Sequence, residues 1–363
     1  MIYLDYQATT PLAPEAREAM LPWLAGPEAS GMMLGYANPH SPHRPGRMAA
    51  AAVEVAREQV AALLPPGGRV IFTSGATEAI NLALVGSGAK RLAVSAIEHA
   101  AVLDTARAID PALTVIPVDD EGLVAPDAEL GDASRLVAVM QVNNEIGTVQ
   151  PVEDLAKRAH AQGALFLCDA VQGAGKLSAP AGADMIAISG HKLFGPKGIG
   201  ALWLRDGLEL APLIRGGGQE QGLRSGTLSP ALCAGFGAAA ALAAQRMEED
   251  AAHVAQLWQG ARDVLSRWTL NGSQGQRWLG NLNLRLEGLD VARLMSDLRD
   301  IAFSAGSACA SGSGRTSHVL RAIHLADEQA KSSIRLGFGR YSGLRDIEDA
   351  CTRIEAAAAA QGV

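Results

Sequence analysis

Between residues 69 and 188, short apolar runs alternate with helical stretches, and this alternation constrains the fold more than any other feature. The apolar runs predict strands at 69–73, 91–95, 113–117, 135–140, 164–168 and 185–188. The stretches between them predict helices that end near Val85, begin at Glu98 and span 151–162. Such an order is typical of a mostly parallel sheet with helices on both faces, whose ligands bind at the carboxyl ends of the strands. We therefore predict an α/β fold.

The rest of the chain follows a different pattern. Towards the N-terminus we predict a helix from about Glu15, and a proline- and glycine-rich loop at 35–47 that leads into a helix at 48–64. Towards the C-terminus we predict helices at 229–248, 251–268, 290–299, 316–323 and 346–360 and strands at 281–286 and 333–338. A chain of 363 residues can form two domains. We predict a large domain of residues 14–248 and a smaller α+β domain of residues 1–13 and 249–363.

Composition excludes several classes of partner. A net charge of −7 and a pI near 5.7 argue against binding to nucleic acid or to an anionic membrane surface. No apolar run approaches the roughly 20 residues of a membrane span, and the opening residues MIYLDYQATTP do not resemble a signal peptide. We expect a cytoplasmic protein. The four cysteines lack CxxC spacing, so we predict neither a disulfide framework nor a metal site.

A lysine follows the last predicted strand of the series, in the segment DMIAISGHKLFGPKGIG at 184–200. Lysines are most often solvated surface residues. Lys192, however, lies at a buried strand end beside His191, and burial with a cationic neighbour lowers the pKa of an amine. Such an amine is a nucleophile towards carbonyl groups, which is what a Schiff-base lysine requires. We predict that Lys192 anchors pyridoxal 5′-phosphate (PLP).

Other polar residues also follow predicted strands. Residues 74–77, Ser-Gly-Ala-Thr, open a helix whose backbone N–H groups and Thr77 hydroxyl could bind a phosphate, although a simple helix cap explains them equally well. Asp169 could pair with a pyridinium nitrogen, or it could cap a helix. Gln172 could bind a ring hydroxyl. His99 could stack on the ring and transfer protons, although most histidines at helix starts are structural.

Cys309 lies in a segment made only of small residues, Ser304 to Gly314. Segments of this composition are mobile and accessible to solvent. A buried structural cysteine does not suit such a loop, whereas a thiol that moves between an active site and an outside acceptor does. The other three cysteines lie in apolar or alanine-rich segments and fit a core.

Taken in series, these motifs resemble the NifS/IscS-type cysteine desulfurases, within the class V aminotransferases of PLP fold type I. The resemblance runs along nearly the whole chain, through YLDYQATTP, NPHSPHRPGR, FTSGATEAINLAL, EHAAVL, VMQVNNEIGTVQP, DAVQGAGK, SGHKLFGPKG, RGGGQEQGLRSGT, GSACASG, SHVLRA and SIRLGFGR. It implies conversion of L-cysteine to L-alanine with transfer of the sulfur to Cys309 as a persulfide. It also implies a homodimer and a sulfur-acceptor protein such as an iron–sulfur scaffold.

The resemblance also implies roles for individual residues. Lys192 would hold PLP covalently and abstract the α-proton of the substrate, with His99 stacked on the ring. Arg335 and Asn144 would bind the substrate, with Arg335 on its carboxylate, a task suited to guanidinium geometry. The remaining contacts to the cofactor would come from Ala76, Thr77, Asn144, Asp169, Gln172, Ser189, His191 and, across the dimer interface, Thr227.

The sequence also allows two other functions. A PLP-dependent transaminase or lyase of the same fold would need Lys192 and Asp169 but not Cys309. An inactive scaffold for iron–sulfur assembly proteins would need none of the three.

Overall fold

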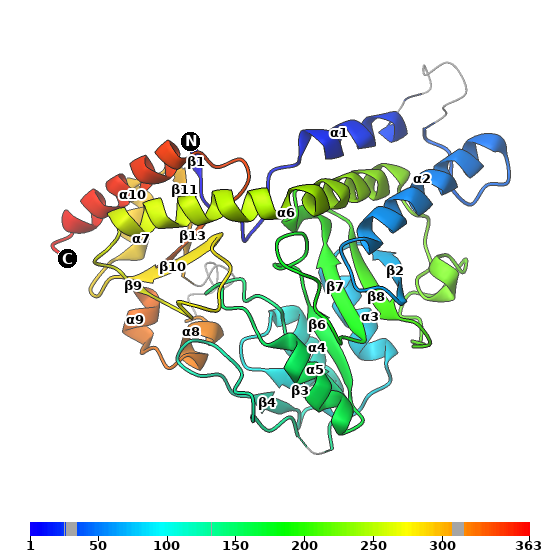
Figure 1. The fold of residues 1–363 in the computed structure, drawn as a ribbon, viewed down its shortest axis with the longest axis horizontal. Coiled ribbons are helices and arrows are strands. Elements are labelled where there is room, and N and C mark those ends of the chain that lie inside the picture. The colour runs from blue at the N-terminus through cyan, green and yellow to red at the C-terminus, as the bar shows by residue number, and fades with distance from the viewer. Residues whose placement is uncertain (25, 27–34, 132, 307–315) are drawn as a thin grey trace.

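Two sheets and one long helix dominate the molecule (Figure 1). The computed structural model describes residues 1–24, 26, 35–131, 133–306 and 316–363. Strand β1 (Ile2–Tyr3) pairs in parallel with β11 (Ile301–Ala302), which brings the N-terminus beside the last third of the chain. Among the described residues, no helix is both long enough and apolar enough to cross a membrane.

The larger sheet has seven strands in the spatial order β2-β8-β7-β6-β5-β3-β4. In chain order they are β2 (Gly68–Thr73), β3 (Leu92–Ser95), β4 (Thr114–Ile116), β5 (Leu136–Ala138), β6 (Leu165–Asp169), β7 (Met185–Ser189) and β8 (Gly200–Arg205). Six of these strands run in one direction, and β8, between β2 and β7, runs in the opposite one. The prediction of a mostly parallel α/β sheet is therefore confirmed, although β8 was not predicted.

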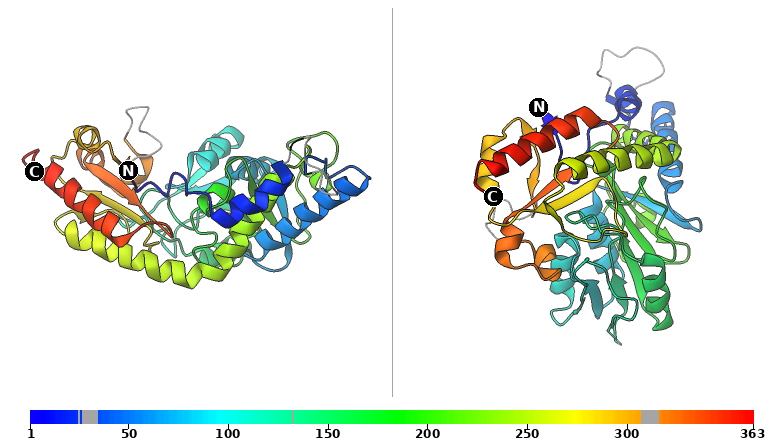
Figure 2. Two further views of the ribbon diagram at one scale, coloured as in Figure 1. Left: turned by 90° about the horizontal axis from the view of Figure 1, so that it is seen from above. Right: turned by 60° about the vertical axis from the view of Figure 1, so that its left-hand side comes forward.

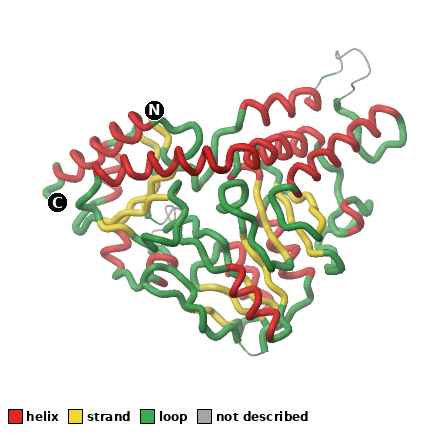
Figure 3. Tube along the Cα trace, in the orientation of Figure 1, coloured by secondary structure: helices red, strands yellow, loops and turns green. Residues whose placement is uncertain are grey.

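Helices cover both faces of this sheet (Figure 3). They are α1 (Pro14–Met20), which continues into the 3₁₀ helix η1 (Leu21–Leu24), α2 (Arg44–Ala61), α3 (Ala76–Gly86), α4 (Ala100–Ile109), α5 (Val152–Ala161) and α6 (Pro230–Val264). Successive side chains of a strand point to opposite faces. On β6, Phe166 therefore belongs to the cluster that contains Phe236 of α6, whereas Leu167 belongs to the cluster that contains Leu82 of α3.

The smaller sheet is antiparallel, in the order β12-β13-β10-β9. Its strands are β9 (Thr269–Leu270), β10 (Asn281–Arg285), β12 (Ser304–Ala305) and β13 (Ser333–Gly337). The helices of this region are α7 (Val291–Asp297), α8 (His318–Ala322), α9 (Asp327–Lys331) and α10 (Leu344–Ala359). A separate core, with Trp268, Leu336 and Ile354 among its members, lies between this sheet, α6 and α10. Both chain termini lie at this end (Figure 2).

Three of the predicted helices are wrong in their extent. The helices predicted at 229–248 and 251–268 form the single helix α6, because no glycine or proline lies near the supposed break and Arg246 pairs with Glu249 and Asp250 across it. The helix predicted from residue 48 begins at Arg44, since His43 accepts a hydrogen bond from the Gly46 N–H and proline is tolerated in a first turn.

The domain boundary predicted between residues 248 and 249 falls inside α6. The first half of this helix packs on the larger sheet and the second half on the smaller one, as the two separate cores show. We propose that the chain is divided into two domains which share α6.

Candidate functional site

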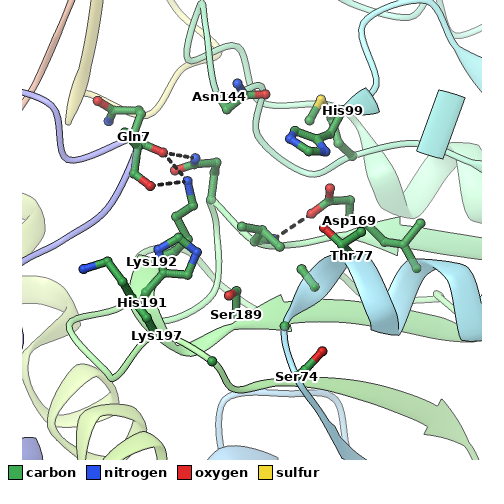
Figure 4. Close-up of a pocket in the computed structure, with 18 of the residues that line it drawn as sticks. Gln7, Ser74, Thr77, His99, Asn144, Asp169, Ser189, His191, Lys192 and Lys197 are labelled. Carbon is green, nitrogen blue, oxygen red and sulfur yellow. Dashed lines mark hydrogen bonds between the residues drawn. The ribbon is translucent and has the colours of Figure 1, made fainter. Parts of the chain in front are cut away.

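A cavity of about 520 Å³ opens at the carboxyl ends of β5, β6 and β7 (Figure 4). It brings together residues from segments that are far apart in the chain. The predicted site residues that line it are Ala76, Thr77, His99, Asn144, Asp169, Gln172, Ser189, His191, Lys192 and Arg335. This placement agrees with the rule that open α/β sheets bind ligands at their carboxyl ends.

Lys192 ends the short 3₁₀ helix η2 (Gly190–Lys192), which follows directly on β7. Its Nζ donates hydrogen bonds to the backbone carbonyls of Gln7 and, at 2.9 Å, of Ala8. The N-terminal segment therefore holds the amine inside the cavity (Figure 4). Backbone carbonyls carry no full charge, so the amine can exchange these contacts for a covalent bond without leaving a buried anion unpaired.

His191 precedes the lysine and is held as a neutral imidazole. Burial, together with the positive charges of Lys192, Lys197 and Lys176, lowers its pKa to about 4. Its Nδ1 lies 3.2 Å from the Thr9 hydroxyl. A neutral ring beside the lysine adds a hydrogen-bonding group to the cavity without adding charge.

Asp169 supplies the carboxylate of the cavity at the end of β6. It is 5 % exposed, and one of its oxygens accepts a 3.0 Å hydrogen bond from the Val171 N–H. Burial raises the pKa of this carboxyl, while the Val171 N–H, His99 and Lys192 act to lower it. A buried carboxylate with a single hydrogen bond is incompletely paired, so a cationic ring nitrogen bound in the cavity would be stabilised there.

Behind Asp169 lies a second buried carboxyl, that of Glu98. Its Oε1 lies 2.5 Å from the Ser95 hydroxyl and accepts a 2.8 Å hydrogen bond from the Met140 N–H, whereas Oε2 has no partner among the described residues. Burial raises the pKa of Glu98 to about 8, and the charge of Asp169 acts in the same direction. At neutral pH, Glu98 is protonated and does not repel the Asp169 carboxylate.

Gln172 lies one turn beyond Asp169 and faces the N-terminal segment. Its Nε2 donates a 3.0 Å hydrogen bond to the Gln7 carbonyl, the same oxygen that Lys192 contacts. Its Oε1 is buried and has no partner among the described residues. Buried polar atoms are nearly always paired, so this oxygen is available to a ligand of the cavity.

The start of α3 forms the opposite wall of the cavity. Gly75 is its N-cap, with no side-chain cap, so the first backbone N–H groups of an 11-residue helix are left to a ligand. Ser74, Thr77 and Ser189 also line the cavity here. An uncapped helix N-terminus surrounded by hydroxyl groups is well suited to bind a phosphate.

His99 and Asn144 lie on the far side of the cavity from this helix (Figure 4). The Nδ1 of His99 accepts a 3.1 Å hydrogen bond from the Ala101 N–H. This bond fixes the tautomer, because a nitrogen that accepts cannot carry the proton, and neutral His99 is therefore protonated on Nε2. The backbone carbonyl of Asn144 accepts hydrogen bonds from Asn281 and Arg335, which leaves its side chain to the cavity.

Arg335 reaches the cavity from β13 of the smaller sheet, and only 1 % of the residue is exposed. Its Nη2 lies 2.7 Å from a carboxylate oxygen of Asp5, and its Nη1 donates a 3.0 Å hydrogen bond to the Asn144 carbonyl. Its Nε has no partner among the described residues. The guanidinium is thus already oriented by three segments of the chain, which favours recognition of a second carboxylate.

One predicted residue, Thr227, is exposed and does not line this cavity. Cys309 lies outside the described residues. The other cysteines are free and fully buried. Burial raises the pKa of the Cys233 and Cys351 thiols to about 12 and that of Cys168 well above its usual range, so these thiols do not form nucleophilic thiolates at neutral pH.

Sequence reasoning missed three residues that shape the cavity: Asp5, Gln7 and Glu98. All three lie in motifs with recognisable patterns, YLDYQATTP and EHAAVL. Gln7 acts through its backbone carbonyl, for which a side chain gives no signal. Among the described residues, no three His, Cys, Asp or Glu side chains are grouped so that they could hold a metal ion.

The chain is similar to known proteins both in sequence and in structure. The model of the aminotransferase class-V family matches residues 2–349. The cysteine desulfurase IscS of Rickettsia akari (strain Hartford) is 41 % identical, over 98 % of this chain and 91 % of that protein. The structure of a NifS-like protein from Rickettsia africae ESF-5 superposes with a TM-score of 0.87 at 30 % identity, covering 98 % of this chain and 99 % of the other. A structure of SspA in complex with cysteine superposes with a TM-score of 0.80 at 34 % identity, covering 94 % and 100 % of the two chains.

Proposed function

Because the chain belongs to the class-V aminotransferase family, we propose that it is a PLP-dependent cysteine desulfurase, which converts L-cysteine to L-alanine and retains the sulfur as a persulfide. The observation that carries this proposal is the position of Lys192, in one cavity with the buried Asp169 carboxylate and the uncapped start of α3. The IscS relative and the cysteine complex of SspA support cysteine as the substrate.

The residues of the cavity fit PLP. The N–H groups at the start of α3, with Thr77, Ser189 and His191, would hold its phosphate, and Asp169 would pair with its ring nitrogen. The unpartnered Oε1 of Gln172 lacks the hydrogen bond that a polar group of the ring could supply. When bound, PLP supplies an electron sink that stabilises negative charge at the α-carbon of an amino acid.

The side chains of the chain bind and orient the substrate and move its protons. Arg335 binds the substrate carboxylate, and the Asp5 carboxylate fixes the plane of its guanidinium. Lys192, once released from the cofactor, removes the α-proton with its neutral amine. His99 offers an N–H at Nε2 on the far side of the cavity, where it can donate a hydrogen bond to a ligand.

Sulfur transfer is assigned to Cys309, which lies outside the described residues. Its thiolate attacks the substrate sulfur and forms the S–S bond of a persulfide. The carbon–sulfur bond breaks, its electron pair returns to carbon, and that carbon takes up a proton to give alanine. The raised pKa values of the three buried cysteines support Cys309 as the nucleophile by excluding the alternatives.

We further propose that the enzyme is a homodimer in which Thr227 of each chain reaches the phosphate site of the other. The exposed position of Thr227, away from the cavity of its own chain, supports this arrangement. Sedimentation should detect a dimer, and a fully active monomer would contradict the idea. The final sulfur acceptor is an iron–sulfur assembly protein, which should copurify with persulfide-loaded enzyme.

Replacement of Lys192 with alanine tests the assignment of the cofactor. Wild-type protein should be yellow, should be bleached by borohydride and should then carry the mass of reduced PLP on the peptide that contains Lys192. The Lys192→Ala variant should show none of this and no turnover. The matched control is Lys157→Ala, at an exposed ion pair on α5, which should behave as wild type. Normal turnover by Lys192→Ala would refute the proposal.

A second experiment separates a desulfurase from a transaminase of the same fold. Wild-type protein given cysteine should release alanine and gain one sulfur atom on the peptide that contains Cys309. Cys309→Ser should bind PLP and cysteine yet release almost no alanine, because a hydroxyl cannot hold a persulfide. Transfer of an amino group to a keto acid without sulfide release, or sulfur on Cys168, Cys233 or Cys351, would contradict the assignment.

A further inference from the structure

A small second cavity lies behind the N-terminal segment, on the side away from the PLP site. Its volume is about 20 Å³, which is enough for a small occupant such as one water molecule or one monatomic ion. Gln7 lines both cavities, and its backbone carbonyl accepts the hydrogen bond from Lys192. A ligand in the second cavity would therefore be separated from Lys192 by Gln7.

Two basic side chains line this cavity, and each has a donor group without an acceptor among the described residues. Lys176 is partly buried, and its side-chain ammonium forms no hydrogen bond or ion pair with any described residue. Arg340 has a side chain that is 4 % exposed, and its Nη1 is buried without a partner. Neither residue has a role in the PLP site, although each ends a motif that the sequence analysis identified, DAVQGAGK and SIRLGFGR.

Asp250 of α6 is the one carboxylate among the residues that line this cavity. Its Oδ2 accepts hydrogen bonds from Nε and Nη2 of Arg340, at 2.8 and 2.5 Å, and its Oδ1 lies 3.4 Å from Nε of Arg246, so this carboxylate is already paired with arginines. With Lys176 protonated, two cations and one carboxylate leave one uncompensated positive charge. The other residues that line the cavity are uncharged, and four of them are aromatic: Tyr6, Phe194, Trp278 and Phe338. An unpaired buried cation is costly, so the cavity favours a ligand of charge −1.

We propose that this second cavity binds one small monovalent anion of the chloride class, held between the Lys176 ammonium and the Nη1 of Arg340. The anion pairs with the two donors that lack acceptors and offsets the repulsion between Lys176 and Lys192. A water molecule fits the volume, but it leaves the positive charge uncompensated.

Binding should depend on pH through Lys176. Burial lowers its pKa to about 7, and the charge of Lys192 acts in the same direction. The other charged or titratable groups that face Lys176 across the cavity are Arg340, Asp250 and Tyr6. Because the anion binds the protonated lysine, its affinity should be about tenfold weaker at pH 8 than at pH 6.

Bromide is the probe for the test, since it scatters X-rays anomalously and resembles chloride in charge and nearly in size. Crystals of the holoenzyme soaked in sodium bromide should show an anomalous peak between Lys176 and Arg340. In solution at constant ionic strength, replacing gluconate with chloride should raise the melting temperature, more at pH 6 than at pH 8. Lys176→Met is close in length and neutral, and it should lose both effects, whereas Lys157→Met should keep them.

Two results would overturn the proposal. One is a water molecule in the cavity with no bromide peak in wild-type crystals. The other is a chloride effect on melting that Lys176→Met retains in full. Should Lys176→Met fail to fold, the double variant Arg340→Gln with Asp250→Asn removes the second donor and its counter-ion together. It should also lose the peak, and retention of the peak there would refute the role of Arg340.

Discussion

Replacement of Glu98 with glutamine should stabilise the protein, and the gain should grow as the pH rises. The folded protein raises the pKa of Glu98 from 4.5 to about 8. Below pH 4.5 the carboxyl is neutral in both the folded and the unfolded states, so its ionisation does not affect stability. Between pH 4.5 and 8 only the unfolded state releases the proton, so the folded state loses about 1.4 kcal/mol per pH unit. Above pH 8 the carboxyl is ionised in both states, so the loss of stability no longer grows with pH.

The size of the effect follows from these values. At pH 7 the unfolded carboxyl lies 2.5 pH units above the pKa of 4.5, which corresponds to about 3 kcal/mol of lost stability. Glutamine keeps the acceptor that Ser95 and Met140 contact but leaves an amide N–H group unpaired, at a cost of about 1 kcal/mol. The net gain of about 2 kcal/mol corresponds to a rise of about 3 °C in the melting temperature of a chain of this length.

Differential scanning calorimetry between pH 5 and pH 8 measures this gain. The matched control is Glu248→Gln, because Glu248 is exposed on α6 and forms no ion pair with any described residue. Its melting temperature should follow that of the wild type at every pH. A gain for Glu98→Gln that is equally large at pH 5 and pH 8, or no gain at pH 8, would refute the protonated state of Glu98.

Three other predictions follow from the described contacts. Asp169→Asn keeps the size of the side chain but removes its charge, so turnover should fall by roughly 10²–10³-fold while PLP still binds, as absorbance and alanine release would show. Arg57 and Glu220 form a largely buried ion pair at 2.7 Å, so Arg57→Met should cost about 3–5 kcal/mol in denaturant unfolding, and addition of Glu220→Gln should recover part of this loss. Iodoacetamide should alkylate three cysteines only after denaturation, as peptide mass mapping would show: Cys168, Cys233 and Cys351.

The sequence predicted the strands of the larger sheet because each is a short apolar run beside a helix. Once the sheet was inferred to be parallel, the rule about carboxyl ends placed Lys192 and Asp169 on one edge. The structure brings both into one cavity. Strand β8 was missed because only its long-range pairing with β2 and β7, which no local pattern reveals, makes it part of this sheet.

The contacts that orient the site were harder to predict, because they join distant segments of the chain and no local sequence pattern indicates them. Arg335 and Asp5 are 330 residues apart in the chain, and their ion pair depends on how the smaller sheet packs against the N-terminal segment. The contact of Lys192 with the Gln7 carbonyl depends on the path of the backbone rather than on any side chain. The protonated state of Glu98 follows from complete burial, which the sequence alone does not reveal.

Helix α6 has a mechanical consequence for catalysis. A continuous helix of 35 residues is about 52 Å long at 1.5 Å per residue, and it joins the core of the larger sheet to that of the smaller one. Rotation of one sheet against the other would have to bend this helix and lengthen its hydrogen bonds. The helix is therefore a rigid connection that keeps Arg335 of the smaller sheet at a fixed distance from Lys192 of the larger one. Entry and exit of the substrate would then depend on movement of short segments at the rim of the cavity, while the two sheets stay fixed relative to each other.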